Sequence, residues 1–318
     1  MGTDQDAMVV GAEAPTAADA GDPEAWMAHG WALFGARRFG EAVGAAQQAA
    51  ELAPDDANPH QLMGRAYLDD DRVDQACEAF QCAIKLDGAY VEPYVSLGVL
   101  HFWRTGDYGA ALDSFEHALA LDPDHPWARA QMGMTFAYMG RAAEAIASLA
   151  ETVHLQPDNE RALENLAMVH LAQGRYDEAI ATCRLYVTVN PEVNDPHRIM
   201  GYALGQLGRY EEAITALGRA VVLSPGIYEI RGTLARLLRA VGRYAEADRH
   251  HAIAADQAAA DDDFGRASFA AVCDDSDRAL ALLEVALAEG QTDLGWLRVD
   301  PDLVLLRADP RFRALIEA

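Results

Sequence analysis

Small and large apolar residues recur along this chain in a fixed order, with polar turns between them. An alanine in a Glu-Ala-like context returns every 34 residues, with one step of 35. The positions are Ala42, Ala76, Ala111, Ala145, Ala179, Ala213 and Ala247. Twelve residues before each of them, thirteen in one unit, lies a second small residue such as Gly30, Gly64 or Gly201. Two small residues let a pair of antiparallel helices approach closely, so each unit is predicted to fold as helix, turn, helix.

The predicted helices have start and stop signals. Glycine followed by arginine marks the turn inside several units, as at Gly174 and Gly208. Glycine has no Cβ and adopts the left-handed conformation of a helix C-cap without a steric penalty. Several units close with Leu-x-Pro, as at Pro54 and Pro225, where proline stops the second helix.

In its length and in this order of small and large residues, the unit resembles the tetratricopeptide repeat family. The stretch from Pro23 to Pro54 carries the family motif almost in full. Seven repeats are counted, at 23–56, 57–90, 91–125, 126–159, 160–193, 194–227 and 228–261. The resemblance implies an all-α fold, a right-handed superhelical solenoid of helix-turn-helix repeats.

The sequence on either side of the repeats differs from them. Residues 1–22 are mostly small or acidic with little bulk, and we expect them to be disordered. A degenerate eighth repeat is expected over 262–290, followed by a tail like those that close many bacterial arrays of this family. An open stack of helices needs such a cap because its last apolar face would otherwise contact water. The expected organisation is 1–22, 23–261 and 262–318.

Three departures from the repeat predict local changes. Gly88 replaces the closing proline of the second repeat, and the third repeat has one extra residue near Arg104 and Thr105, before its turn. Tyr186 occupies a late second-helix position that is alanine in five of the seven repeats. We expect either local widening around Tyr186 or a tyrosine that reaches an edge and hydrogen-bonds there.

The composition excludes one class of partner and favours one compartment. The chain has 318 residues with 50 Asp and Glu against 25 Lys and Arg, a net charge of −25 that repels nucleic acid. Its four cysteines contain no CxxC pair, which indicates neither a disulfide framework nor a zinc site. No basic residue precedes Arg37 to form a secretory signal, and no apolar run approaches the ~18 residues of a membrane span. We expect a cytoplasmic protein without membrane insertion.

No group of residues predicts catalysis. The ten histidines form no HExxH motif, and Asp263-Phe264-Gly265 spells the kinase metal-binding triplet without its companion motifs. Asp69-Asp70-Asp71 is followed by Phe80 where a calcium loop needs glutamate. Neither a metal nor a cofactor is therefore expected, nor enzymatic activity. Since repeats take up nearly the whole chain, binding is the favoured class of function.

In the family, the first helices of successive repeats line a concave surface that holds peptides, and the resemblance identifies the corresponding positions here. The predicted groove residues are Trp31, Phe34, Arg65, Phe102, Trp103, Trp127, Met134, Tyr138, Arg161, Asn165, Met168, Arg198, Tyr202, Arg236 and Arg239. Helical aromatics also pack in cores, which is the alternative for each of them. Trp103 and Trp127 are the strongest single candidates, because aromatic clusters are favoured binding hot spots.

Charge divides the predicted groove. Six acidic residues and five arginines occupy its positions, and four of the arginines lie in the fifth to seventh repeats, whereas the aromatics concentrate in the first four. A partner with an apolar anchor followed by acidic groups fits this order. Arg161 and Asn165 partly match the clamp of the family's chaperone-tail receptors, but the lysines of that clamp are absent, so it is rejected.

We therefore expect a protein–protein interaction scaffold whose aromatic groove binds a peptide segment of a partner. The alternative is a regulatory subunit or assembly factor of an enzyme complex, with any activity in the C-terminal 60 residues or in the partner. A pocket of perturbed carboxylates around Asp263, Asp274 and Asp275 would favour that alternative. Self-association through the ends of the array is a third hypothesis.

Overall fold

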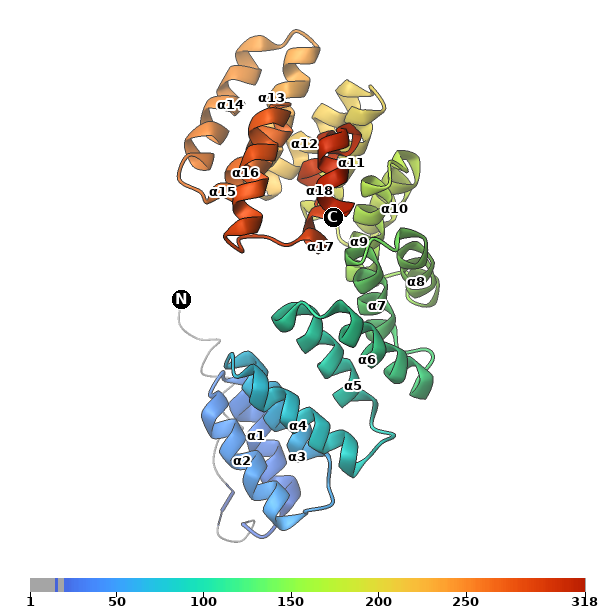
Figure 1. The fold of residues 1–318 in the computed structure, drawn as a ribbon, viewed down its shortest axis with the longest axis vertical. Helices are drawn as coiled ribbons and strands as arrows, with labels where there is room; N and C mark the ends of the chain where they lie inside the picture. The colour runs from blue at the N-terminus through green and yellow to red at the C-terminus, as the bar shows by residue number, and fades with distance from the viewer. Residues whose placement is uncertain (1–14, 17–19, 318) are drawn as a thin grey trace. The chain divides into compact units, whose positions relative to one another are not determined.

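Helices follow one another in pairs that correspond to the predicted repeats. The computed structural model describes residues 15–16 and 20–317, and within them it contains helices and no strand (Figure 1). The pairs are α1 (Pro23–Gly35) and α2 (Phe39–Leu52), α3 (Asn58–Asp69) and α4 (Val73–Leu86), α5 (Val91–Leu100) and α6 (Tyr108–Leu121), α7 (Pro126–Tyr138) and α8 (Ala142–Leu155), α9 (Glu160–Ala172) and α10 (Tyr176–Val189), α11 (Asp195–Gln206) and α12 (Tyr210–Leu223), and α13 (Tyr228–Ala240) and α14 (Tyr244–Ala258). The predicted all-α solenoid of helical repeats is confirmed.

Internal packing divides the chain into two compact units. The N-terminal unit is Met1–Met132 and the C-terminal unit is Gly133–Ala318. Helices α1 to α6 belong to the first unit, helices from α8 onward belong to the second, and α7 runs from one into the other. The sequence predicted one continuous array, so this division inside the fourth repeat was not foreseen. Of residues 1–22, predicted to be disordered, most lie outside the described part.

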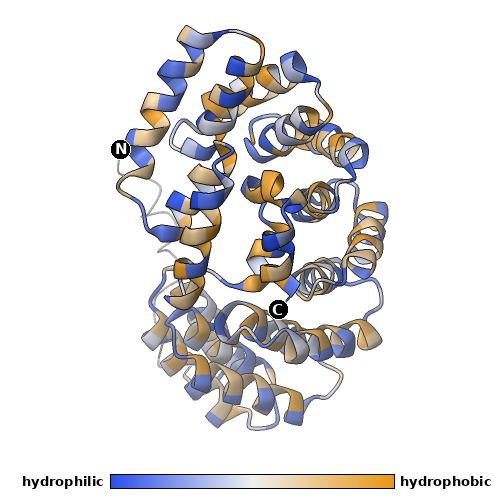
Figure 2. Cartoon of the chain, turned by 45° about the horizontal axis from the view of Figure 1, so that its top comes forward, coloured by the Kyte–Doolittle hydropathy of each residue, from blue (hydrophilic) through white to orange (hydrophobic). Residues whose placement is uncertain are grey.

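The small residues of the repeat lie where the two helices of a pair meet. A Cβ on Gly98 would come within 2.5 Å of the ring of Phe115, and one on Gly201 within 2.5 Å of Leu217. The repeated alanines, such as Ala76, are fully buried. Figure 2 shows hydrophobic and hydrophilic residues alternating along the helices, as expected where each helix buries one side. The predicted close approach of paired helices is confirmed.

The extra residue of the third repeat is absorbed by a π-helical turn. This turn, η2 (His101–Thr105), continues α5 and ends at Gly106, which has a left-handed φ of 66°. A π turn contains one more residue than an α turn, so the insertion is accommodated without disturbing the next helix. Within it Phe102 is buried, whereas Trp103 is 59% exposed.

Tyr186 fulfils one of its two predicted alternatives. The side chain is buried, and its hydroxyl lies 3.4 Å from a carboxylate oxygen of Glu160 on α9. Asn190 donates a second hydrogen bond to the same oxygen, at 3.1 Å. The tyrosine therefore connects the end of α10 to the start of α9 within its own repeat.

The chain ends in a segment that folds back on the C-terminal unit. After the degenerate repeat, α15 (Asp263–Val272) and α16 (Ser276–Ala288), come α17 (Leu294–Val299), η3 (Pro301–Ala308) and α18 (Pro310–Glu317). Residues 294–317 are called the C-terminal segment below. Four of its side chains, Leu297, Leu303, Leu306 and Phe312, are fully buried in one core with α15 and α16. The segment contacts α15, as a cap would, and it also contacts α9 and α11 (Figure 1), which the sequence did not predict.

Candidate functional site

The predicted groove residues lie on or next to the first helices of the repeats, and they are divided between the two compact units. The N-terminal unit holds Trp31, Phe34, Arg65, Phe102, Trp103 and Trp127. The C-terminal unit holds Met134, Tyr138, Arg161, Asn165, Met168, Arg198, Tyr202, Arg236 and Arg239. Below, the N-terminal face means the side of α1, α3 and α5, with the start of α7, that carries the first set. The C-terminal face means the corresponding side of α9, α11 and α13.

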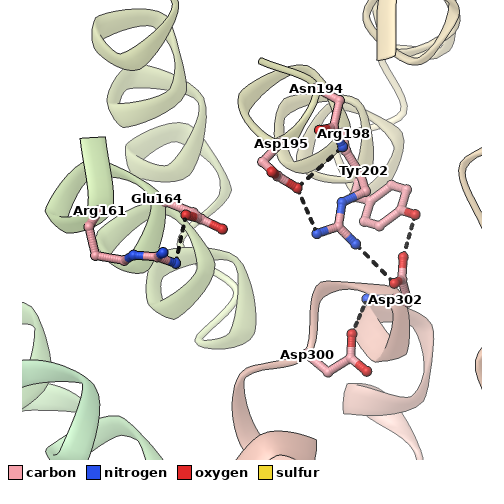
Figure 3. Close-up of polar contacts among 8 residues, drawn as sticks. All are labelled: Arg161, Glu164, Asn194, Asp195, Arg198, Tyr202, Asp300 and Asp302. Atoms are coloured by element: carbon pink, nitrogen blue, oxygen red, sulfur yellow. Dashed lines mark hydrogen bonds and ion pairs between the residues drawn. The ribbon is translucent and has the colours of Figure 1, made fainter. Parts of the chain in front are cut away.

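An aspartate of the C-terminal segment is bound on the C-terminal face. Asp302 accepts a hydrogen bond from Arg198 on α11 at 3.0 Å, and the hydroxyl of Tyr202 donates to its other oxygen (Figure 3). Arg198 also donates to Asp195 at 3.0 Å. The Asp302 amide donates to Asp300 at 2.9 Å, which caps the start of η3. Arg198 and Tyr202 are thus both occupied by the chain's own C-terminal segment.

A second contact fastens the segment to the end of α7. Arg298 of α17 donates to the main-chain carbonyl oxygen of Tyr138 at 2.7 Å and to that of Ile316 at 2.6 Å. A cavity of about 320 Å³ lies beside this contact, lined by Arg298, Arg307 and residues of α7 and α9. One guanidinium therefore joins α7, α17 and α18.

Burial shapes the electrostatics where η3 meets α11 and α13. Desolvation, together with the nearby charge of Asp302, raises the pKa of Asp300 to about 7 and that of Glu229 on α13 to about 8. Attraction to the surrounding carboxylates more than offsets burial for Arg198, so its pKa is raised and it stays charged. The cluster holds a buried cation among acidic groups, two of which take up protons readily.

The other predicted residues of the C-terminal unit are also engaged within the chain. Met134, Asn165 and Met168 are buried. Arg161 lies 3.4 Å from Glu164 (Figure 3), and Arg239 donates to Asp248 at 2.9 Å. Arg236 is largely desolvated, and this burial lowers its pKa. On this face, a partner would reach Arg198 and Tyr202 only after the C-terminal segment had left.

The N-terminal face has an open hollow of about 310 Å³. Its lining residues are Gln61, Arg65, Leu68 and Asp69 of α3, Glu92, Val95, Ser96 and Val99 of α5, and Trp127 of α7. These positions repeat every three or four residues, so each helix presents one side to the hollow. The lining combines the apolar side chains of Leu68, Val95 and Val99 with three charged groups, those of Arg65, Asp69 and Glu92.

Gln61 lies at the floor of this hollow and is 3% exposed. Its amide nitrogen donates to the hydroxyl of Ser96 at 2.9 Å, which fixes the side chain between α3 and α5. Its carbonyl oxygen has no hydrogen-bond partner among the described residues. A buried acceptor without a donor is destabilising, so a donor brought into the hollow would be bound favourably.

Two exposed tryptophans lie on the N-terminal face, one in the lining of this hollow and one beside Arg65. Trp127 is 43% exposed at the edge of the hollow, and Trp31 is similarly exposed on α1. The Arg65 guanidinium lies over the rings of Trp31 and Phe34, 5.3 and 5.0 Å from their centroids. A second hollow of about 390 Å³ adjoins Trp31 and is lined by Glu24, Asp56 and neighbouring residues.

The three aspartates that would have favoured catalysis, Asp263, Asp274 and Asp275, lie at or near the ends of α15 and α16. Asp263 pairs with Arg266, and Asp275 accepts from the Arg278 amide at 3.3 Å, capping α16. Asp274 has a left-handed φ of 67° in the turn between α15 and α16. No cluster of three His, Cys, Asp or Glu side chains suited to a metal occurs in the part of the chain that the structure describes. Residues 15–16 and 20–317 also include no helix of the length and hydrophobicity required to cross a membrane.

Sequence reasoning missed the floor of the N-terminal hollow and the aspartate on the C-terminal face. Gln61 and Ser96 could have been found from their helical spacing with Arg65 and Glu92, since all four share the inner sides of α3 and α5. Asp302 carries no such signal, because its partner Arg198 is 104 residues away in the sequence.

A family model and several solved structures resemble the chain. The model described as Tetratricopeptide repeat matches residues 62–126, 131–196 and 200–263, more than half of the chain. No curated protein matches the chain. Cut9–Hcn1, a hetero-tetramer of the APC/C, is 17% identical, with 84% of this chain and 50% of that chain covered and a TM-score of 0.59.

Two further structures cover shorter stretches. PilW, a type IV pilus biogenesis factor, is 19% identical, with 64% of this chain and 94% of that chain covered and a TM-score of 0.58. YrrB, a repeat protein of the same kind with an unusual peptide-binding site, is 21% identical, with coverages of 57% and 94% and a TM-score of 0.50. At these identities the likeness shows the fold alone.

Proposed function

Since the chain belongs to the tetratricopeptide repeat family, we propose that it is a protein–protein interaction scaffold that binds a peptide segment of its partner on the N-terminal face. The observation that carries this proposal is the open hollow between α3, α5 and α7, with Trp127 exposed at its edge. Binding pockets typically combine an apolar lining with a few polar groups, as this hollow does.

The contrast between the two faces supports the choice of site. On the C-terminal face, Arg198 and Tyr202 are taken up by Asp302. On the N-terminal face, Trp31, Trp103 and Trp127 are each more than a third exposed. Exposed tryptophans beside a hollow are typical of the anchor points of an interface. YrrB, described as having a peptide-binding site, shares this fold and is consistent with such a use of the repeats.

Five of the six predicted groove residues of the N-terminal unit have a role in the proposal. Trp127 and Trp31 form contact surfaces for apolar groups of the peptide. The guanidinium of Arg65 lies over the ring of Trp31, and this cation–π contact helps to orient the ring. Phe102 is buried and supports Trp103, with ring centroids 4.7 Å apart, so Trp103 is the member of that pair that a partner can touch.

A selection of peptides tests the proposal. The full chain is panned against a random linear peptide library, and the selected peptides are measured by fluorescence anisotropy. Trp127→Ala is expected to weaken their binding by about tenfold or more, the loss of a typical hot spot. Tyr244→Ala is the matched control, because Tyr244 is an exposed aromatic residue on a second helix, α14. Equal binding by wild type and the Trp127 variant would refute the proposed site.

A further inference from the structure

We propose that the hollow beneath Trp127 takes a lysine or arginine side chain of the bound peptide, an inference that rests on the proposed function. Its polar lining residues are Asp69, Glu92, Gln61, Ser96 and Arg65, and the guanidinium of Arg65 lies over the rings of Trp31 and Phe34. The hollow thus offers apolar surface for the methylene groups of such a side chain and hydrogen-bond acceptors for its charged end.

The charge around the N-terminal face favours a cation. Four carboxylates line its two hollows, those of Glu24, Asp56, Asp69 and Glu92, whereas Arg65 is the one basic residue in either lining. Arg65 is held over the rings of Trp31 and Phe34. An acidic side chain entering the hollow would be repelled by the carboxylates, and a purely apolar one would cover them without compensation.

The carboxylates beside the first hollow are available for a ligand. Among the described residues, the Asp69 carboxylate forms no ion pair and accepts no hydrogen bond, and that of Glu92 has one long contact, 3.4 Å from Nε2 of His125. Both can accept charge-assisted hydrogen bonds, which are stronger than neutral ones.

The walls of the hollow suit the stem of such a side chain. Leu68, Val95 and Val99 are apolar and line the same hollow as the two acidic residues. Lysine and arginine pack their methylene groups along apolar surface while the charged end reaches a polar group. Trp127 at the edge can stack on the cation, as Trp31 already does with Arg65 on the same face.

Gln61 supplies the remaining acceptor. Its buried carbonyl oxygen lacks a donor among the described residues, and its side chain lines the hollow. A carbonyl oxygen accepts and never donates, so it selects an N–H or O–H group and rejects a carboxylate. The floor and the sides of the hollow therefore select for the same chemistry.

The experiment uses the full chain and peptides from a random linear library. Each selected peptide is synthesised again with arginine replaced by citrulline and lysine by acetyl-lysine, which removes the charge and keeps the length. We expect the selected peptides to share a basic residue, and its neutral replacement to weaken binding by about tenfold. The double variant Asp69→Asn, Glu92→Gln is expected to weaken the basic peptide by a similar factor and to leave the neutral one unchanged.

The control and the opposing outcomes separate the two proposals. Asp74→Asn removes an acidic group on the second helix α4 and is expected to leave binding unchanged. Peptides that lack a shared basic residue, yet depend on Trp127, would overturn the cation inference and leave the proposed function standing. Peptides that bind independently of Trp127, or a selection that yields none, would overturn the proposed function. Circular dichroism of each variant confirms that it folds.

Discussion

Arg198 and Asp302 are 104 residues apart in the sequence, and their side chains lie 3.0 Å apart. Both are largely buried, and Tyr202 donates a further hydrogen bond to the same carboxylate. A residue at a predicted partner-binding position on the sixth repeat is therefore paired with the chain's own C-terminal segment. The pair connects the sixth repeat to the C-terminal segment.

Breaking this pair is expected to destabilise the C-terminal unit. Arg198→Ala leaves Asp302 buried without its cation, and the loss of one partner from a buried ion pair costs about 3–5 kcal/mol. The free energy of unfolding in urea measures the effect. Hydrogen exchange of residues 294–317 should rise at the same time.

An exposed pair serves as the control for that variant. Arg209 and Glu212 lie 2.7 Å apart at the start of α12, and both side chains are exposed. Arg209→Ala is expected to change the unfolding free energy little, because exposed ion pairs contribute little. Equal effects of the two arginine variants would contradict the structural role of the Arg198 pair.

The C-terminal unit is expected to lose stability as the pH rises. The pKa of Asp300 is raised to about 7 and that of Glu229 to about 8, whereas such carboxyls titrate near about 4 in an unfolded chain. These two groups therefore bind more protons in the folded state between these values, and their contribution to the free energy of unfolding falls from about pH 5 to about pH 8. Asp302 strengthens this uptake of protons, whereas Arg198 and Arg307 oppose it.

Urea denaturation at a series of pH values measures the slope. Asp300→Asn and Glu229→Gln each remove one of the two carboxyls. Each variant should therefore show a smaller fall of the unfolding free energy with pH than the wild type. A slope that neither variant changes would show that neither carboxyl is protonated in the folded chain.

The close approach of α3 and α4 is expected to tolerate no added methyl group. A Cβ on Gly64 would collide with the ring of Phe80, so Gly64→Ala should lower the unfolding free energy by about 1–3 kcal/mol. Gly44 lies inside α2 with nothing within 4 Å of its added Cβ. Gly44→Ala should therefore stabilise the chain by up to about 1 kcal/mol, from helix propensity alone. In thermal denaturation, Gly64→Ala should lower the melting temperature and Gly44→Ala should raise it.

Phe312 is expected to anchor the C-terminal segment. Its side chain is fully buried against the core of α15 and α16, so Phe312→Ala should cost about 3–5 kcal/mol. Leu315→Ala is the comparison on the same helix, because Leu315 is only partly buried there. Protease cleavage within 294–317 should accelerate strongly for the first variant and weakly for the second.

The repeat made most of the fold predictable. Gly98 and Gly201 stand where a larger side chain cannot fit, so their spacing reports helix pairs directly. The step of 35 residues predicted an insertion near Arg104 and Thr105, and the structure places a π turn at that point. The form of the turn was not predictable, because a loop of one extra residue would satisfy the same spacing.

The site was less predictable because its contacts join residues of different elements. First-helix position predicted that Trp31 and Trp127 would lie on the same type of surface. It did not reveal that Tyr202 is covered, since the covering residue, Asp302, belongs to a segment without repeat periodicity. Local patterns report which side of a helix is apolar, and they do not report which distant segment packs there.

Arg298 binds the carbonyl oxygens of Tyr138 and Ile316, and so ties the last helix of the chain to one that ended about half the chain earlier. In an ordinary helical array each repeat contacts only its neighbours, so a terminal repeat can open while the others stay folded. Here the end is fastened at residue 138, so the last repeats cannot fray singly. They should open together in one cooperative step, and they should fold slowly, because contacts between distant residues form late.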